Sequence, residues 1–578
     1  MVKKKNVALI GLGPHAKRIY LNYFKKHNIE LGLIVDLESK RDSVKKYLNE
    51  NNFKNTKIYT IDDKYKDNIH LPNNISQTLA EICKTLEISH IIISTEPKAH
   101  NMYLEFALKN NIDVLTDKPI TVCKNMTSLK SINEISKQYN EIIKLANNSK
   151  AMCNVMCQRQ YHRGYEYIKN LLTDVVKKYQ VPITYIDIYH CDGNWEMPHD
   201  LLKENHPYKY GYGKLFHSGY HFIDLLSDFV KINNQLSDTK KITKGSIYST
   251  CFTPNDELAV FNIKDYKRIF KEQEIPDYYN QNQNPKFNKF GEKNFYGQLT
   301  FKNANNQTIT TANLNLLHYG FSRRGWIQSK DYYKSNGRIR HERINIQVGT
   351  LLNIQVHSYQ SKEIKDRLDI LQEEEIGGLE HFDIDIYRNV DILGGKPFER
   401  IKLGDLYSEK EKKNILGYNE LSREEYLTNF LKGKCSKGDI RDQALGIEIL
   451  KSCAIGIHNH YNNKKQVEKI NIKNSNMYSI KIDTLKSFSI RDNIKQEKVM
   501  LDHYSIIGND AEYGVILNHL KNKNDYEIYL YIESDNKIAS FLLYKELTNR
   551  VMAKLYFKYL KYIASKTSIN KIAKKLGI

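Results

Sequence analysis

Two side chains of this chain, Lys118 and His221, stand in patterns suited to acid–base chemistry on a hydroxyl group. Lys118 belongs to Asp117-Lys118-Pro119 at the end of an apolar run, and ligands of parallel sheets bind at the carboxyl ends of strands. A lysine there can stabilise the alkoxide that forms as a hydride leaves carbon. His221 follows the glycine-rich stretch 211–213 and shares a predicted helix face with His217. Its imidazole titrates near neutral pH and can remove the proton of an alcohol.

Each of these side chains also has a structural interpretation. Lys118 could be a surface lysine beside a turn proline, and His221 a core histidine whose hydrogen bonds Asp224 satisfies. His217 and His221 have the spacing of helical metal ligands, but no third ligand stands at a diagnostic spacing. The sequence therefore predicts no metal site.

The N-terminal segment predicts a nucleotide-binding βαβ unit. The apolar run 7–10 precedes Gly11-x-Gly13-x-x-Ala16, and a second apolar run ends in Asp36. Glycines in such a turn let a pyrophosphate approach a helix N-terminus, and an acid about 20 residues later can bind ribose hydroxyls. A carboxylate there repels a 2′-phosphate, so NAD is expected, while Lys40 and Arg41 keep NADP possible. A doubly wound sheet with no ligand is the alternative.

The whole chain is predicted to be an α/β protein with an N-terminal domain, residues 1–150, and two regions that follow it. Apolar runs alternate with polar, helix-compatible segments up to about residue 150, which predicts a parallel sheet covered by helices. Longer β-rich runs then predict an α+β domain over 151–474 with a large, mostly antiparallel sheet, and a C-terminal extension follows over 475–578. The expected strands include 7–10, 31–35, 57–59, 90–94, 113–115, 151–156, 184–190, 245–252, 297–301, 308–317 and 344–357.

Other segments carry weaker signals. Helices are expected at 75–86, 101–109, 126–145 and 440–461, whereas the lysine-rich stretches 264–293 and 402–425 are expected to be insertions or surface loops. The extension predicts a hairpin over 528–543 and a lysine-rich amphipathic helix near 551–566, either docked on an anionic surface or, with more support, simply solvated.

Size and composition exclude several classes of protein. The 578 residues, 40% of them hydrophobic, exceed one ordinary domain. The net charge of +21 comes from lysines spread along the whole chain, without an arginine-rich arm, so no nucleic-acid partner is expected. The eight cysteines form no C-x-x-C pair and are expected to be buried thiols, and no apolar run is long enough to span a membrane. A cytoplasmic protein is expected.

Taken together, these stretches resemble the Gfo/Idh/MocA oxidoreductases, the family of glucose-fructose oxidoreductase and inositol dehydrogenase. Residues 117–119 are similar to that family's E-K-P, and 211–224 to its G-G-G-x-L-x-D-x-G-x-H-x-x-D. Residues 159–165 are similar to its R-R-Y-D-x-G-Y. The resemblance implies a Rossmann domain followed by a domain whose open sheet often forms a homo-oligomer interface. It also implies redox chemistry on a sugar or polyol with a nicotinamide cofactor.

Carried onto this chain, the resemblance makes Lys118 and His221 the catalytic pair, with His217 beside them. One position departs from the family, because His217 stands where the family has an aspartate, so His221 loses an anionic partner that would raise its pKa. The cofactor-binding residues would be Gly11, Gly13, His15, Ala16, Asp36, Thr95, Pro97, His100, Lys118 and Arg159. The substrate-binding residues would be Lys118, Tyr161, Trp195, His217 and His221.

The expected function is that of an NAD(P)-dependent dehydrogenase or reductase acting on a sugar, sugar derivative or nucleotide sugar. Two alternatives remain open at this point. The first is an enzyme that keeps its NAD bound and uses transient oxidation, as in glycosidase or internal redox cycles. The second is a non-enzymatic, dinucleotide-sensing regulator of the same fold.

Overall fold

The structure of this protein, a computed structural model, divides the chain into two compact units, residues 1–478 and 479–578. It describes residues 6–123, 125–126, 128–202, 207–271, 275, 279, 284–322, 324–325, 327, 337–360, 380–408, 411, 418–435, 437–462, 464 and 467–472 of the first unit, and 498–507, 512–520, 525–534 and 537–547 of the second. Each unit is considered by itself.

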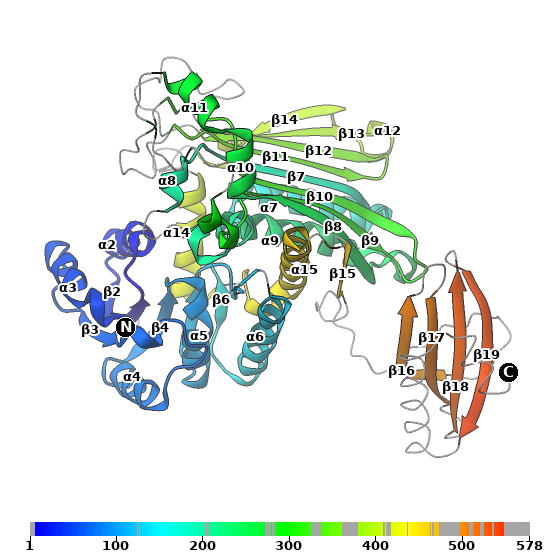
Figure 1. The fold of residues 1–578 in the computed structure, drawn as a ribbon, viewed down its shortest axis with the longest axis horizontal. Coiled ribbons are helices and arrows are strands. Elements are labelled where there is room, and N and C mark those ends of the chain that lie inside the picture. Colours follow the sequence, from blue (N-terminus) through cyan, green and yellow to red (C-terminus); the bar gives the residue numbers. More distant parts are fainter. Residues whose placement is uncertain are drawn as a thin grey trace. The chain divides into compact units, whose positions relative to one another are not determined.

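The first unit begins with a six-stranded parallel sheet in the order β3-β2-β1-β4-β5-β6 (Figure 1). Helices lie on both of its faces, which confirms the predicted Rossmann domain. The predicted boundary near residue 150 falls between α6 and β6, and it remains a proposal. The strands are β1 (Asn6–Ile10), β2 (Glu30–Leu37), β3 (Lys57–Ile61), β4 (Ile88–Ile93), β5 (Asp113–Thr116) and β6 (Cys153–Val155). The helices are α1 (Pro14–Ala16), α2 (Asn22–His27), α3 (Arg41–Glu50), α4 (Asn73–Thr85), α5 (His100–Lys109) and α6 (Leu129–Asn148).

A nine-stranded mixed sheet follows in the order β14-β13-β12-β11-β7-β10-β9-β8-β15. Strand β10 pairs with β7 in parallel, and every other described pair is antiparallel, so the expected mostly antiparallel sheet is confirmed. The single run expected over 344–357 is wrong, because residues 349–351 turn the chain between β11 and β12. The strands are β7 (Ile183–Asn194), β8 (Lys244–Phe252), β9 (Asn294–Lys302), β10 (Thr308–Tyr319), β11 (Arg340–Val348), β12 (Leu352–Gln360), β13 (Glu380–Arg388), β14 (Phe398–Lys402) and β15 (Val467–Ile470).

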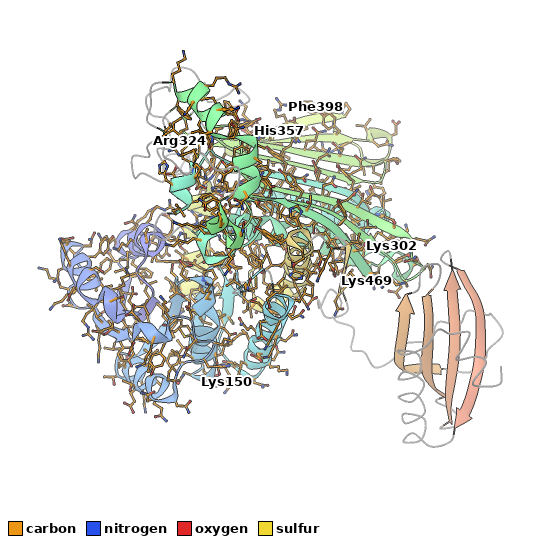
Figure 2. The ribbon with its side chains drawn as sticks, viewed as in Figure 1. Lys150, Lys302, Arg324, His357, Phe398 and Lys469 are labelled. Atoms are coloured by element: carbon orange, nitrogen blue, oxygen red, sulfur yellow. The ribbon has the colours of Figure 1, made fainter. Side chains whose placement is uncertain are left out.

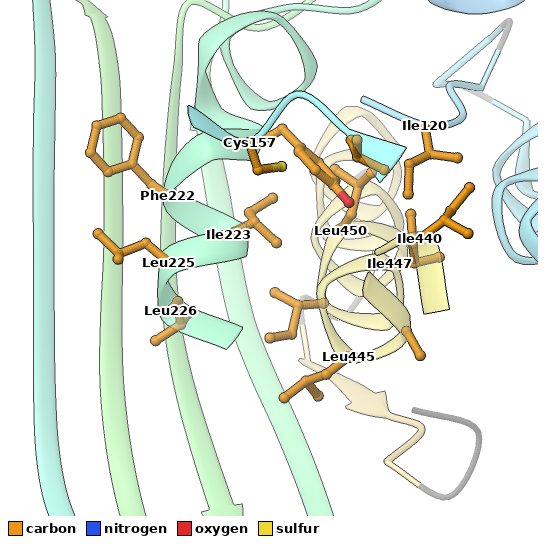
Figure 3. Close-up of a cluster of buried hydrophobic side chains, with 14 of the residues drawn as sticks. Ile120, Cys157, Phe222, Ile223, Leu225, Leu226, Ile440, Leu445, Ile447 and Leu450 are labelled. Carbon is orange, nitrogen blue, oxygen red and sulfur yellow. The ribbon is translucent and has the colours of Figure 1, made fainter. Parts of the chain in front are cut away.

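Helices cover one face of this large sheet. Helices α7 (Arg163–Tyr179), α9 (Tyr220–Ile232) and α15 (Ala444–Tyr461) lie on that face, and α15 also packs against α6. Figure 3 shows the apolar contact between α9 and α15, in which Ile223 of α9 lies toward Leu450 and Ile447 of α15. The other face carries half-buried polar side chains, including His357 of β12, which Figure 2 labels near Phe398 of β14.

Two segments expected to be loops contain helices. Helix α11 (Ile263–Phe270) buries Tyr266 and Phe270, and α14 (Tyr418–Leu431) buries Tyr426, Leu427 and Phe430. Helix α14 packs against the N-terminal domain, so its apolar face is covered even though most of its sequence is polar. The shorter helices are α8 (Pro198–Leu201), α10 (Pro254–Val260) and α12 (Val390–Leu393).

The second unit contains a four-stranded antiparallel meander in the order β16-β17-β18-β19. The predicted hairpin is formed by β18 (Asp525–Ser534) and β19 (Lys537–Leu547), whereas β16 (Lys498–Ile507) and β17 (Glu512–Leu520) are not anticipated by the sequence analysis. The helix expected at 551–566 lies outside the described residues.

Two further findings concern the whole described chain. All eight cysteines are free thiols, seven of them buried. Among the described residues, no helix combines the length and the apolar character needed to cross a bilayer.

Candidate active site

The glycine turn after β1 has the geometry that a dinucleotide needs. Gly11 has φ +86°, and a Cβ atom there would lie 2.6 Å from the Ser94 carbonyl oxygen, so a side chain is excluded. At Gly13 the backbone is extended, and a Cβ atom would meet no heavy atom within 4 Å. The turn therefore leaves open room in front of the helix that begins at Pro14.

The helix after this turn connects the cofactor loop to the end of β5. Between α1 and α2 it passes through a π-helical segment, Lys17–Leu21, a distortion that frequently marks functional sites. This segment carries Tyr20, which is fully buried and whose hydroxyl donates a hydrogen bond to Asp117. The Ser94 hydroxyl donates to the other oxygen of Asp117 at 2.7 Å. Asp117 thus joins the first helix to the loop after β4.

Asp36 lies where a ribose-binding acid is expected. Its carboxylate accepts the Leu12 N–H of the glycine turn at 2.8 Å and the Leu37 N–H at 2.8 Å. Arg41, a cation that could have favoured a 2′-phosphate, is instead bound to Glu38 through its Nε at 2.7 Å. Together with the room at Gly13, this arrangement fits a dinucleotide with a free ribose hydroxyl.

Lys118 reaches from the first domain to the helix that carries the histidines. Its Nζ donates a hydrogen bond to the backbone carbonyl of His217. Burial lowers the pKa of Lys118 to about 8, although Asp117 raises it. At neutral pH the side chain is therefore still mostly an ammonium group, but one with a readily lost proton.

His217 and His221 stand on consecutive turns of the helix opposite Lys118. His217 lies in a second π-helical segment, Leu215–Gly219, and His221 lies in the first turn of α9. Burial, followed by the nearby Lys118 charge, lowers the pKa of both imidazoles well below the usual range. Among the described residues, Nδ1 of each ring has no hydrogen-bond partner. Both rings are therefore neutral bases at neutral pH.

Asp224 does not satisfy His221, so that structural interpretation is not realised. The Asp224 carboxylate accepts hydrogen bonds from Gln160 and Gln443, both at 2.8 Å. Burial raises the pKa of Asp224 to about 7. This acid ties the segment after β6 and the start of α15 to α9.

A buried network of ion pairs and hydrogen bonds holds the π-helical segment Leu215–Gly219 in place. Lys214, which is fully buried, donates to Asp192 at 2.5 Å, to His190 at 2.9 Å and to Ser218 at 2.8 Å. The turn before it is held by Glu292, whose carboxylate accepts the Leu215 N–H at 2.7 Å. The network fixes the helix turn that presents His217.

The network continues through His318. Its Nδ1 lies 3.2 Å from Asp192 and its Nε2 lies 2.9 Å from Glu196, so both ring nitrogens face carboxylates. Lys293, fully buried, then bridges Glu196 and Glu257 at 3.1 Å each. The sequence analysis did not identify the residues of this network. Lys214, which lies between Gly213 and the apolar Leu215, was a signal that could have identified one of them.

The loop after β4 places three more of the predicted cofactor residues. Pro97 begins a 3₁₀ turn before α5, and Thr95 is only partly exposed beside the Gly11 turn. His100 is fully buried, with ring nitrogens 2.9 Å from the Pro119 carbonyl and 3.2 Å from the Thr95 carbonyl. His100 thus connects the two loops and can act on a cofactor only through them. His15, half exposed, lies 3.8 Å from Asp117.

The remaining predicted residues pack against other side chains of the protein. Arg159 is buried against Glu342 and over the Phe222 ring, and Tyr161 packs on Tyr426 at 4.6 Å between ring centroids. Trp195 stacks within an aromatic cluster formed with Phe261 and with Tyr266 of α11. No group of three metal-binding side chains occurs among the described residues.

A glycine turn, an acid in β2 and a lysine that contacts the helix of the two histidines fit the class of dinucleotide-dependent oxidoreductases. Residues 5–157 match the model of the Gfo/Idh/MocA family, which is described as "Oxidoreductase family, NAD-binding Rossmann fold". The expected family and the nicotinamide cofactor are thereby confirmed over this region. No curated protein matches the chain.

Several solved structures are similar to this chain, at low identity and with TM-scores below 0.5. An oxidoreductase domain protein from Kribbella flavida is 12% identical, with 81% of this chain and 99% of that chain covered and a TM-score of 0.48. Aldose-aldose oxidoreductase from Caulobacter crescentus, complexed with glycerol, is 12% identical over 81% and 100%, with a TM-score of 0.46. The WlbA dehydrogenase from Bordetella pertussis, in complex with NADH and UDP-GlcNAcA, is 11% identical over 81% and 98%, with a TM-score of 0.44.

Proposed function

We propose that this protein is an NAD-dependent dehydrogenase or reductase that acts on a hydroxyl or keto carbon of a sugar, sugar derivative or nucleotide sugar. The observation that carries the proposal is the contact between Lys118 and the His217 carbonyl, one helical turn before His221. This contact brings the cation of the first domain beside the neutral base of the second.

In this proposal the two side chains differ in charge and therefore in role. His221 is neutral because burial lowers its pKa, so it can accept the substrate hydroxyl proton. Lys118 is cationic below pH about 8 and stabilises the oxygen as negative charge develops. The dinucleotide that Gly11, Gly13 and Asp36 would hold would supply the acceptor for the hydride and its two electrons, so that oxidation of the hydroxyl carbon leaves a carbonyl. The reverse reaction uses the same groups.

The remaining expected residues have assigned roles in the proposal. Gly11, Gly13, Ala16 and Asp36 hold the dinucleotide, and His15 lies beside its path. Thr95, Pro97 and His100 shape the loop around it. His217 and Trp195 contact the substrate, whereas Arg159 and Tyr161 act from the packed layer behind the site.

The proposal is tested by NADH formation when the purified protein, NAD and a panel of sugars and nucleotide sugars are mixed. We expect reduction of NAD with one class of compound, and loss of turnover in Lys118→Ala and His221→Ala with the dinucleotide still bound. NAD binding without any reduction would favour a self-recycling enzyme or a regulator. Wild-type turnover by Lys118→Ala would refute the proposed chemistry.

The proposal includes a homo-oligomer. The support is the face of the nine-stranded sheet that no described helix covers. There Tyr189, Arg343 and His357 stand in neighbouring strands; Arg343 is exposed and the other two are half-buried. A second copy of the chain packed on this face would bury them. Light scattering after size exclusion tests this, with a dimer or larger assembly expected and a monomer at micromolar concentration contradicting it.

A further inference from the structure

Glu38 and Arg41 form an ion pair with two hydrogen bonds just after β2, close in the chain to the acid expected to bind ribose. Arg41 donates from Nε to Oε1 of Glu38 at 2.7 Å and from Nη2 to Oε2 at 2.9 Å. The pair uses both oxygens of the carboxylate and two nitrogens of the guanidinium, the most directional geometry for such a contact. Glu38 therefore fixes the direction in which the Arg41 guanidinium points.

Thr60 of β3 connects this ion pair to the ribose site. Its hydroxyl accepts a hydrogen bond from Arg41 and donates one to Glu38. Thr60 is also the residue of β3 that stands beside Asp36 of β2 in the parallel sheet. The Arg41 guanidinium is thus anchored on the strand next to Asp36, at the same end of the sheet.

The turn that carries Glu38 is held by a separate contact. Glu38 begins the 3₁₀ turn Glu38–Lys40, in which Ser39 donates to Asp63 from its N–H at 2.9 Å and from its hydroxyl at 2.6 Å. Asp63 follows β3, so this contact joins the turn after β2 to the turn after β3. The backbone that presents Glu38, and Arg41 at the start of α3, is therefore fixed.

The charges of the pair matter more for a ligand than for folding. The hydrogen bonds from Arg41 and then from Thr60 lower the pKa of the Glu38 carboxyl, which is ionised at neutral pH. The side chains of Glu38 and Arg41 are 53% and 54% exposed, so the pair adds little to folding stability. A guanidinium already bonded through two nitrogens has fewer donors left for an anionic ligand.

The 2′-phosphate of NADP is the anion that would compete for this arginine. It stands on the ribose in place of the hydroxyl that Asp36 is suited to bind, and in dinucleotide sites a nearby arginine accommodates it. Here the phosphate would meet the carboxylates of Asp36 and Glu38, together with an arginine whose Nε and Nη2 already have partners. Both the repulsion and the missing donors work against NADP.

We propose that Glu38 is a specificity-determining residue of the cofactor site, which excludes NADP by occupying Arg41, the cation that would otherwise bind the 2′-phosphate. The inference rests on the proposed function, because it concerns the dinucleotide which that function requires, and it adds a second residue to the role of Asp36. Loss of Glu38 leaves Arg41 at Thr60, beside the ribose site, where its guanidinium can bind a phosphate. The chain therefore contains a latent NADP site that one substitution opens.

The test measures binding of NADH and of NADPH to the full chain by calorimetry, with no substrate present. We expect the wild-type protein to bind NADH at least about tenfold more tightly than NADPH. Glu38→Ala should raise NADPH affinity roughly 10- to 100-fold, the range of a hydrogen bond to a charged group, and change NADH affinity by no more than about twofold. The double variant Glu38→Ala/Arg41→Ala has the net charge of the wild type and should lose this gain.

Asp42→Ala is the matched control, because Asp42 is an exposed acid next to Arg41 in α3, and its loss changes the charge equally while Glu38 stays in place. It should change the ratio of the two affinities by no more than about threefold. Retained NADH binding shows that each variant is folded.

Four results would overturn the inference. They are NADPH binding to the wild type as tight as NADH binding, an unchanged preference in Glu38→Ala, a gain that survives in the double variant, and an equal gain in Asp42→Ala. The last two would mean that charge repulsion alone sets the preference. A wild-type protein that binds neither NADH nor NADPH would instead overturn the proposed function.

Discussion

Replacement of Gly13 by alanine separates the cofactor-binding role of the glycine turn from its structural role. The Gly13 backbone has φ −74° and ψ 177°, which alanine adopts without strain, and its Cβ would meet no protein atom within 4 Å. Folding stability should therefore stay the same or rise by about 0.5 kcal/mol, because alanine restricts the unfolded chain. A pyrophosphate seated on this turn would meet the new methyl group, so NAD affinity should fall at least about tenfold, or about 1.4 kcal/mol.

The comparison variant is Gly11→Ala. Gly11 has φ +86°, and the added Cβ would lie 2.6 Å from the Ser94 carbonyl oxygen and 2.9 Å from the Thr95 side chain. A left-handed conformation costs about 1–2 kcal/mol for alanine, and the contacts add to this cost. Denaturant melts and NAD titration of both variants give the result. Unchanged NAD affinity in a stable Gly13→Ala protein would refute the idea that this turn cradles the cofactor.

Three further outcomes follow from the site. Burial lowers the pKa of Lys118 to about 8, and its ammonium form is the active one, so kcat/KM for alcohol oxidation should fall as pH rises through about 8. A value of kcat/KM that rises over this pH range would instead make Lys118 the base. Lys214→Met should lower the free energy of unfolding in urea melts by about 3 kcal/mol, because Asp192 loses its nearest buried cation. Adding Asp192→Asn to that variant should restore part of the loss, and additive effects of the two substitutions would contradict the pairing. Asp36→Ala should weaken NAD binding and reduce the preference for NAD over NADP roughly tenfold, measured by titration with each reduced cofactor; an unchanged preference would remove Asp36 from the ribose site.

The first domain was predictable because its signals are local. Apart from β3, the strands of the parallel sheet are short and largely buried, and the positive φ at Gly11 requires a glycine in the first turn. Strands β7, β8, β9 and β10 of the second sheet were found for the same reason, whereas β11 and β12 were predicted as one run and β13 and β14 were missed. The pairing of these strands was not predictable, because β7 lies between β10 and β11, strands far from it in the chain.

The supporting residues of the site could not be read from the sequence. Asp192 and Lys214 meet only because β7 and the turn before α9 are folded together, and nothing in their spacing indicates a contact. Helix α14 was not predicted, for a different reason. The helix is mostly polar, and its apolar residues, such as Leu427 and Phe430, are buried against a domain more than 250 positions earlier in the chain.

The most direct test of the central claim is the transfer of deuterium from substrate carbon to the nicotinamide. A hydroxyl compound that reduces NAD in the panel is prepared with deuterium on the carbinol carbon, and the NADH is analysed by mass spectrometry. Direct hydride transfer at the Lys118–His221 site predicts one deuterium in the NADH of the wild-type protein and no NADH from Lys118→Ala. Deuterium that is released to water, or NADH formed equally by Lys118→Ala, would contradict it.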